Sequence, residues 1–476
     1  MITYQDLLAV GDGEQNRIDF VYKVINDWQT TEIYKKSSDT RAYYASEDVE
    51  ILKFQKFLTK VTGEQIPDLW SANYKITSNF LERFITQKVQ TLLGNGVTWN
   101  NEETADKLGT KNKPFDSQLK ELGENASIDS VSFGFFDVDH VNVFQVREFA
   151  PLFDEENGSL KAGVRFWQID ADKPLRAVLF ELDGYTEYIW RKGNGEKANG
   201  EIFKPKKAYK KAVREAPIGG AEIYDYMNYP EFPIVPFWNN KHRQSDFKAA
   251  IKTKIDVYDM IYSGFANTVD EASYIYWTLQ NAGGMDDIDI QEFIDRLKKL
   301  HAVAVDDNVT ATPNSIQAPF EARETLLTRL ERDLYRDAMA VDESNVSGGA
   351  ATATEIKAAY EPLSRKVDAF EYSAIQFVNG ILAVAGIDDN PTFTRSVTIN
   401  TGEELQNVLS AAVILPPEYV AEKVVTLLGD GDRADEIIAE MHRNEQERLV
   451  DERREQTEGN YYTTEENAAQ RGAEGE

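Results

Sequence analysis

The chain has 476 residues, 42% of them hydrophobic and 28% charged, which is enough for two to four domains with a sizeable core. It contains no cysteine, which excludes disulfides and thiolate zinc sites. No apolar run approaches the roughly 18 residues of a membrane helix, and the first residues lack a secretion signal. A soluble protein made in the cytoplasm is therefore expected.

The charge balance is strongly acidic, with 52 Lys and Arg against 81 Asp and Glu and a formal charge of -29. Proteins that grip duplex DNA neutralise its phosphates with basic side chains. The balance therefore argues against a DNA-gripping module. It leaves open an ordinary acidic protein and a protein past which DNA slides.

The first third of the chain is predicted to be mainly helical, with short helices up to about residue 70. From Trp70 to Leu93, apolar residues return every three to five positions, which predicts an amphipathic helix that ends at Gly94. A further helix is expected near 115–123.

From Val131 the pattern changes to β-branched and aromatic runs separated by turn residues. The runs "VNVFQVREF", "GVRFWQI", "RAVLFEL" and "TEYIWRK" predict antiparallel strands. The basic segment Phe203 to Arg214 fits a solvated hairpin or loop, or a contact with an acidic partner. The two prolines of "EFPIVPFWNN", residues 231–240, predict an extended segment.

Two long helices and a compact αβ segment between them are predicted next. Ser245 is expected to cap a helix that runs to about Asp270. Its apolar stripe consists of Phe247, Ile251, Ile255, Tyr258, Ile261, Tyr262, Phe265 and Val269. The αβ segment reads as a strand at 273–279, a helix at 289–300 and a strand at 301–305. The helix at 321–341 carries a packing seam of Leu327, Leu330, Leu334, Ala338 and Val341.

A soft polar loop, "SNVSGGAATAT", separates this helix from one at about 354–385. Pro362 lies inside the latter, so a kink is expected there. A short strand at 395–399 and three helical patterns follow. The last pattern fades into an acidic, low-complexity tail that is expected to be disordered.

No residues form a recognisable catalytic constellation. The acidic clusters at Asp137–His140 and Asp286–Asp289 do not match a calcium loop and fit turns or helix starts better. Gly348 and Gly349 are not followed by the Lys-Ser/Thr of a phosphate-binding loop. No catalytic residue, cofactor or metal site is assigned, and the chain is not expected to be an enzyme.

Four blocks, in this order, resemble the portal proteins of tailed bacteriophages, specifically the siphophage family of phages infecting Gram-positive bacteria. They lie at 79–97, 232–267, 321–342 and 347–371, and the resemblance spans roughly residues 70–390. The second block, "FPIVPFWNNKHRQSDFKAAIKTKIDVYDMIYSGFAN", is the most specific. It combines a Pro-aromatic-Asn-Asn approach, a Ser-Asp helix start and an Asp-x-Tyr-Asp inside the helix.

The resemblance implies an α+β portal fold that is mainly helical. Its implied parts are a β-rich wing at 1–245, a stem helix at 246–270, a small αβ clip at 271–320, a second stem helix at 321–341, a tunnel loop at 342–354, a kinked long helix with a return to the wing at 355–402, a helical crown at 403–455, and a disordered tail at 456–476. The expected helix kink is at Pro362.

The resemblance also implies roles for two sets of residues. The DNA-facing tunnel loop would hold Asn345, Val346, Ser347, Gly348, Gly349 and Ala350. The stem packing would use Phe247, Ile251, Tyr258, Ile261, Phe265, Leu327, Leu330 and Leu334. Some family members place a lysine in the first helical turn after the loop glycine, whereas here Lys357 comes later. A specific lysine–phosphate contact is therefore not expected.

The implied function is a head–tail connector in the virion, at one capsid vertex, assembled in the host cytoplasm. The implied partners are other copies in a dodecameric ring, the double-stranded DNA in its channel, the terminase large subunit, a head–tail adaptor, and the major capsid and scaffolding proteins, with no membrane. An acidic channel wall would let DNA slide. The alternatives are another phage structural or adaptor protein, and a nuclease or hydrolase that uses scattered carboxylates and a metal.

Overall fold

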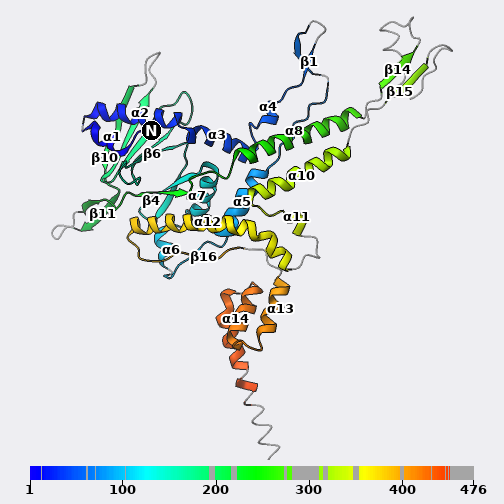
Figure 1. The fold of residues 1–476 in the computed structure, drawn as a ribbon. Helices are drawn as coiled ribbons and strands as arrows, with labels where there is room; N and C mark the ends of the chain where they lie inside the picture. Colours follow the sequence, from blue (N-terminus) through cyan, green and yellow to red (C-terminus); the bar gives the residue numbers. More distant parts are fainter. Residues whose placement is uncertain are drawn as a thin grey trace, which may run out of the picture. The chain divides into compact units, whose positions relative to one another are not determined.

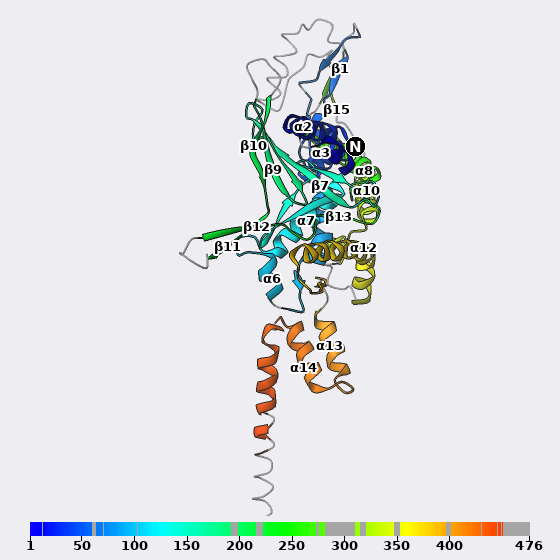
Figure 2. The same cartoon turned by 90° about the vertical axis from the view of Figure 1, so that its left-hand side faces the viewer.

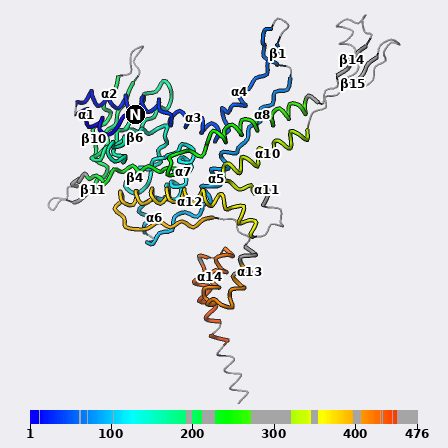
Figure 3. The backbone as a smooth tube through the Cα atoms, in the orientation of Figure 1, coloured from blue at the N-terminus to red at the C-terminus, as the bar shows by residue number. Residues whose placement is uncertain are grey.

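The chain forms two compact units, drawn in Figures 1 and 3. The computed structural model describes residues 1–11, 13–59, 63–69, 71–101, 103–191, 199–215, 222–272, 276–280, 310–314, 320–346, 353–396, 401–429, 431–444, 446–448 and 450. The first unit comprises Met1–Asn345 and Tyr360–Ser396, and the second comprises Val346–Ala359 and Val397–Glu476.

Antiparallel sheets dominate the middle of the first unit, which confirms the predicted strands. The three-stranded sheet has the order β13-β4-β5 and contains β4 (Val131–Asp137), β5 (His140–Phe144) and β13 (Ile234–Trp238). The five-stranded sheet has the order β10-β9-β8-β7-β6 and contains β6 (Phe149–Phe153), β7 (Leu160–Trp167), β8 (Leu175–Glu181), β9 (Gly184–Arg191) and β10 (Asn199–Lys207). Figure 2 shows β10, β9 and β7 as long strands of this sheet, in which β8 lies between β9 and β7.

The predicted basic segment Phe203 to Arg214 is divided between two sheets. It ends β10 and begins β11 (Lys210–Glu215), which pairs with β12 (Glu222–Met227). Lys206 forms ion pairs with Glu181 at 3.1 Å and with Asp183. Lys204 also pairs with Glu187 at 2.8 Å, so part of the segment's positive charge is matched by acids of the same chain.

Four helices begin the chain, and one of them covers the larger sheet. They are α1 (Tyr4–Val10), α2 (Glu14–Thr30), α3 (Glu32–Tyr44) and α4 (Glu50–Lys53). Trp28 of α2 is buried, and its indole donates a hydrogen bond to the carbonyl of Val146 at 2.7 Å. Arg17 of the same helix makes a two-point contact with Glu181 of β8. The apolar face of α2 therefore closes the core against the sheet.

Aromatic packing joins the smaller sheet to the longest helix. Phe237 of β13 stacks on Phe370 and Phe377 of α12 (Ala353–Ala385), with ring centroids 5.4 and 5.2 Å apart. Gly134 of β4 permits this approach, because a Cβ there would stand 2.5 Å from the Phe377 ring. Two further helices complete this core, namely α5 (Phe80–Leu93) and α7 (Phe115–Asp129).

The predicted helix from Trp70 to Leu93 is wrong in its first half, because α5 begins only at Phe80. Residues 71–79, here called the strap, run extended along α8 (Ala249–Ala272). The amide of Tyr74 donates to the Asn267 side chain at 2.6 Å, and that of Ile76 donates to Ser263 Oγ at 2.9 Å. Amides that donate to the side chains of α8 are not available for the backbone hydrogen bonds of a helix at 71–79.

The strap covers a polar stripe of α8 that the apolar periodicity did not reveal. Asp259, Ser263 and Asn267 recur every fourth residue and are only 2–5% exposed. Ser78 lies beside the Asp259 carboxyl, and both Asp259 Oδ1 and Ser78 Oγ are buried without a hydrogen-bond partner. Burial raises the pKa of Asp259 to about 6, and Ser78 only partly opposes the shift.

The remaining described elements of the first unit are mostly of the predicted type, but their boundaries differ from the predicted ones. Helix α10 (Phe320–Ala338) packs against α8, and β14 (Tyr276–Gln280) pairs with β15 (Thr310–Asn314). The predicted helix at 289–300 and strand at 301–305 lie outside the described residues. Most of the strand expected at 395–399 lies outside the described residues. Just before it, β16 (Thr392–Phe393) pairs with β3 (Val97–Thr98).

Short helices form the second unit beyond residue 400. They are α13 (Thr401–Ala411), α14 (Pro417–Leu427), the 3-10 turn Gly431–Arg433 and a helix at 434–444. Val420, Val425 and Ala434 are buried and hold them together. The predicted disordered tail lies outside the described residues. No helix in the described part of the chain has the length and apolarity needed to span a membrane.

We expect Asp259→Asn to stabilise the chain by about 1–2 kcal/mol at pH 8. A carboxyl whose pKa is raised by folding contributes stability below its unfolded pKa and loses that contribution as the pH rises through about 6. Asparagine removes the buried charge and keeps a side-chain carbonyl beside Ser78. Urea unfolding at pH 4 and pH 8 measures the effect, and an equal gain at both pH values would contradict it.

Candidate functional site

The predicted DNA-facing residues lie on the segment that joins α10 to α12. Asn345 and Val346 end the short helix α11 (Glu343–Val346), whereas Ser347, Gly348, Gly349 and Ala350 lie outside the described residues. The structure does describe both flanks of this segment. The candidate site is therefore the set of contacts that holds these flanks.

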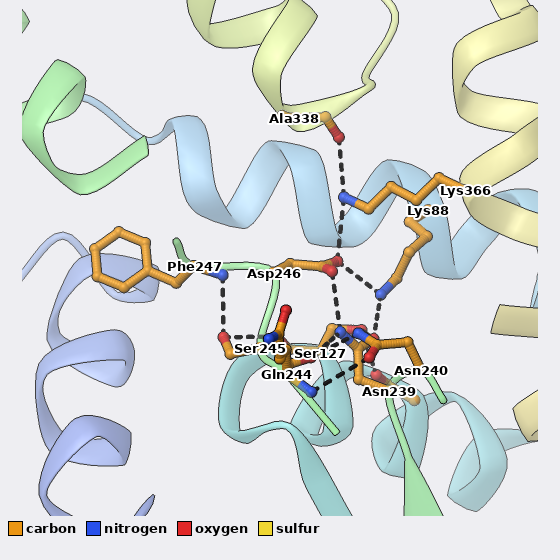
Figure 4. Close-up of polar contacts among 11 residues, drawn as sticks. Lys88, Ser127, Asn239, Asn240, Gln244, Ser245, Asp246, Phe247, Ala338 and Lys366 are labelled. Carbon is orange, nitrogen blue, oxygen red and sulfur yellow. Dashed lines mark hydrogen bonds and ion pairs between the residues drawn. The ribbon is translucent and has the colours of Figure 1, made fainter. Parts of the chain in front are cut away.

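A buried ionic cluster lies at the centre of these contacts, as Figure 4 shows. The Asp246 carboxylate accepts hydrogen bonds from Lys88 Nζ at 2.7 Å and from Asn239 Nδ2 at 2.9 Å. Lys366 Nζ lies 3.2 Å from the same carboxylate. Lys88 belongs to α5, Asn239 follows β13, and Lys366 belongs to α12. One carboxylate thus joins three parts of the fold.

The charges in this cluster are almost completely removed from water. The Lys88 side chain is 1% exposed, and its ammonium lies 4.4 Å from the centre of the Phe370 ring. Burial lowers the pKa of Lys88 to about 8, against the opposing attraction of Asp246. Burial also opposes ionisation of Asp246, but Lys366, Lys88 and the amide of Asn239 outweigh it and hold the pKa of that carboxyl well below its usual range. The carboxylate therefore stays ionised at neutral pH.

The cluster also determines where α8 begins. Asn240 Oδ1 accepts from the amides of His242 and Gln244, which shapes the turn before the helix. The amide of Asp246 donates to the carbonyl of Ser127 at 3.0 Å. Ser245 accepts from the amide of Phe247, but the helix begins only at Ala249. The predicted cap at Ser245 is therefore wrong, because Asp246 is held in the cluster.

Lys366 also connects the two flanks of the loop segment. Its ammonium donates a hydrogen bond at 3.0 Å to the carbonyl of Ala338, the last residue of α10. At this end of α10 the amide of Met339 donates to the carbonyl of Arg336, and the amide of Ala340 donates to the carbonyl of Tyr335. Met339 has φ 54°, a left-handed conformation that glycine adopts more readily.

Helix α5 holds the next residues after α10. The Gln87 amide group donates to the carbonyl of Val341 at 3.0 Å and accepts from the amide of Val341 at 2.8 Å. Arg83, one turn earlier, donates to the Tyr335 hydroxyl at 2.6 Å. The chain is thus bound to α5 as far as Val341. Neither Gln87 nor Lys366 was singled out from the sequence, where long polar side chains on helices are typical of solvated faces.

The predicted stem-packing residues occupy different environments. Ile251 and Leu334 are buried, Tyr258 meets Phe80 edge-on, and Phe265 contacts Phe320 at the α8–α10 interface. The remaining members Ile261, Leu327 and Leu330 are half-buried in the single chain. The packing of these residues in an assembly stays a prediction.

Phe247 does not belong to the interface between the two helices. It precedes α8, and its ring lies 4.8 Å from that of Tyr43 of α3. Because the helix starts two residues after it, the helical spacing that placed Phe247 on the stripe does not apply.

Pro362 lies inside α12, as predicted. It has no N–H to donate to the carbonyl of Ala358, so the helix lacks one bond there. The division between the two compact units falls close by, between Ala359 and Tyr360. The kink itself stays a prediction.

The acidic cluster at Asp137–His140 forms the turn between β4 and β5. The amide of Val138 in that turn donates to the Tyr229 hydroxyl. Within the described ranges no group of three or more His, Asp or Glu is arranged to hold a metal ion. The second cluster, at Asp286–Asp289, lies outside them.

Comparison with known proteins gives consistent results. A family model described as "Phage portal protein, SPP1 Gp6-like" matches residues 29–459. A portal protein of Bacillus phage SPP1 is 24% identical over 78% of this chain and 76% of its own length. A portal protein of Clostridium phage phiCD119 is 27% identical over 40% of this chain, and the match covers less than half of that protein, 44%.

Two solved structures of gene transfer agent (GTA) particles also show a likeness. One is the neck of an empty particle computed with C6 symmetry, which covers 74% of this chain and 90% of its own, at 11% identity and a TM-score of 0.42. The other is the neck of a native particle computed with C12 symmetry, with 73% and 89% coverage, 11% identity and the same TM-score.

We expect Asp246→Asn to destabilise the chain by about 3–5 kcal/mol, because it leaves two ammonium groups without their counter-charge. Lys88→Met should cost less, since Asp246 keeps Lys366. Lys107→Met, which breaks an exposed ion pair with Glu103, is the control and should cost less than about 1 kcal/mol. Denaturant unfolding ranks the three variants, and a larger loss for Lys88→Met than for Asp246→Asn would refute this assignment.

We expect Met339→Gly to stabilise the chain by about 0.5–1 kcal/mol, because glycine relieves the left-handed conformation at the end of α10. Met260→Gly is the matched control. Met260 is exposed inside α8, where glycine costs about 1 kcal/mol. Thermal unfolding should therefore move in opposite directions for the two variants, and a destabilised Met339→Gly would show that this cap is unstrained.

Proposed function

Because the chain belongs to the SPP1 Gp6-like family of phage portal proteins, we propose that identical copies form a closed ring of about twelve at one vertex of a capsid. Double-stranded DNA passes through the ring when the genome is packaged and again when it leaves. The observation that carries this proposal is the family match over residues 29–459, which includes every described element from α3 to the helix at 434–444.

The candidate site supports a specific division of labour. Helices α8 and α10 serve as the stem, and the segment around 345–350 faces the DNA. The contacts of Asp246, Gln87 and Lys366 support this division, because they position the end of α10 and the body of α12 on either side of the segment. The flanking helices can then stay in place while DNA passes.

The charge of the chain supports a conduit rather than a binding site. Each copy contributes a formal charge of -29, and tight binding of DNA by counterion release needs cations at the surface. A wall of this sign keeps the duplex from adhering while it moves. The work of translocation then falls to a separate motor, the terminase large subunit, which meets the clip at 271–320. A head–tail adaptor replaces it there, and the wing contacts the capsid and scaffolding proteins.

Native mass spectrometry and negative-stain imaging of the purified chain test the ring. We expect closed rings of about a dozen copies, with assembly weakened at high salt where it depends on ion pairs between subunits. A nuclease assay with and without divalent cations serves as the control for the alternative enzyme. A chain that stays monomeric and cleaves DNA in a metal-dependent manner would overturn the proposal.

A further inference from the structure

The strap, residues 71–79, is held on α8 by polar contacts rather than by a core. Its residues are exposed or half-buried, and Tyr74 is 55% exposed. In the described part of the chain, residues 71–78 form no hydrogen bond with another backbone group. The amides of Tyr74 and Ile76 donate instead to side chains of α8. A segment with few buried apolar contacts opens at a lower free energy than the core of a protein.

The hairpin before the strap is a weak anchor for it. Strand β1 (Phe57–Thr59) pairs with β2 (Gln65–Pro67), and Figures 1 and 2 both show β1 standing away from the helices. A two-stranded hairpin of this size is marginally stable in water by itself. The firmer anchor is at the other end of the strap, where Phe80, which is 5% exposed, begins α5.

Buried polar atoms beneath the strap favour its opening. Asp259 Oδ1 of α8 and Ser78 Oγ of the strap lie beside one another, and both are buried without a hydrogen-bond partner. Water can bond both atoms once the strap lifts, so their burial costs free energy only in the closed state. The hydrogen bonds from Tyr74 and Ile76 to α8 oppose the opening. The closed strap thus combines favourable and unfavourable polar contacts.

Helix α8 has other contacts that keep it in place when the strap lifts. Phe265 packs on Phe320 of α10, with ring centroids 5.6 Å apart, and Arg323 of α10 donates to Thr268 Oγ1 at 2.6 Å. The start of the helix is held through Asp246. The strap can therefore open while α8 and α10 stay packed.

Asp259 is the titratable group that the strap covers. Burial raises its pKa to about 6, Ser78 partly opposes the shift, and the negative charge of Asp256 adds to it. Asp256 itself is paired with Lys252 at 3.0 Å. The carboxyl is therefore largely ionised at neutral pH, in a place that water does not reach.

The cations nearest to the strap have other partners. Lys75 of the strap donates to the carbonyl of Leu52 at 2.7 Å, and Lys53 of α4 lies 3.5 Å from Asp48 and 4.0 Å from Glu50. Further charged or titratable groups on the surrounding elements are Tyr43 of α3, Glu82 and Arg83 of α5, and Tyr258 and Glu331 at the α8–α10 contact. The ionised Asp259 carboxylate therefore gains more from water than from these groups.

We propose that the strap is a lid on α8 and that ionisation of Asp259 opens it. The lid is closed at acidic pH, when Asp259 is neutral. A carboxyl whose pKa is higher in the closed state stabilises that state below its ordinary pKa and loses the contribution as the pH rises through about 6. Opening then exposes Asp259, Ser263 and Asn267 to water. The lid acts within a single copy, so it does not depend on the ring.

Hydrogen exchange of the full chain, read by mass spectrometry at the amides of Tyr74 and Ile76, tests the lid. Each rate is divided by that of an unstructured peptide of the same sequence at the same pH, which removes the intrinsic pH dependence of exchange. We expect opening to be about tenfold more frequent at pH 8 than at pH 4.5, and to be independent of pH in Asp259→Asn. Asp270→Asn, the same change near the end of α8, is the control and should keep the pH dependence.

Thiol labelling gives a second measurement, because the natural chain has no cysteine. Ser263 is 2% exposed beneath the strap, so the thiol of Ser263→Cys reacts with a maleimide when the strap lifts. Rates are taken relative to Ile169→Cys, since Ile169 is 87% exposed and its rate carries the ordinary pH dependence of a thiol. We expect the relative rate at pH 8 to fall about tenfold when Asp259→Asn is added.

The two parts of the proposal fail in distinguishable ways. Strap amides that exchange only together with those at the α8–α10 contact overturn the lid. A strap that opens by itself, but with the same pH dependence and the same labelling rate in Asp259→Asn as in the natural chain, overturns the role of Asp259.

Discussion

The fold depends on one carboxylate that cannot be left without its cations. Asp246 is surrounded by Lys88, Lys366 and Asn239, and an ion buried in this way is costly unless it is paired and hydrogen-bonded. Helix α5, the turn after β13 and helix α12 must therefore assemble together. The same requirement determines the start of α8 and, through the contact of Lys366 with Ala338, the end of α10. The two helices flanking the loop are positioned by a single ionic cluster.

This arrangement suits a portal protein. A channel that passes DNA needs a frame that keeps its shape and an inner segment that can move. In this chain the frame is fixed by buried charges, by aromatic stacking of Phe237 on Phe370 and Phe377, and by the grip of Gln87 on Val341. The acidic balance of the chain favours sliding over adhesion. The proposed DNA-facing segment begins within a few residues of this frame.

The sequence predicted elements whose signal is local and missed those that depend on distant partners. The β runs, α10, and α12 with Pro362 follow from periodicity and residue type. The start of α5 did not, because the strap gives its amides to Ser263 and Asn267, almost two hundred residues later. Lys88 resembles a surface residue in the sequence, and only the folded chain brings it to Asp246. Phe247 was placed on the apolar stripe of α8 in error, because Asp246 is held by distant partners and the helix begins only at Ala249. The partners of Asp246 come from three separate elements, so no periodicity along the chain marks them as one cluster.

The grip of Gln87 and Lys366 has a consequence for how this chain can diverge. The separation of α10 and α12 is set by contacts outside the segment that joins them, at Val341 and Ala338. Residues inserted or deleted between Asp342 and Thr352 therefore do not alter the register of either helix. The length and chemistry of that segment can therefore change with little effect on the packing of the helices beside it.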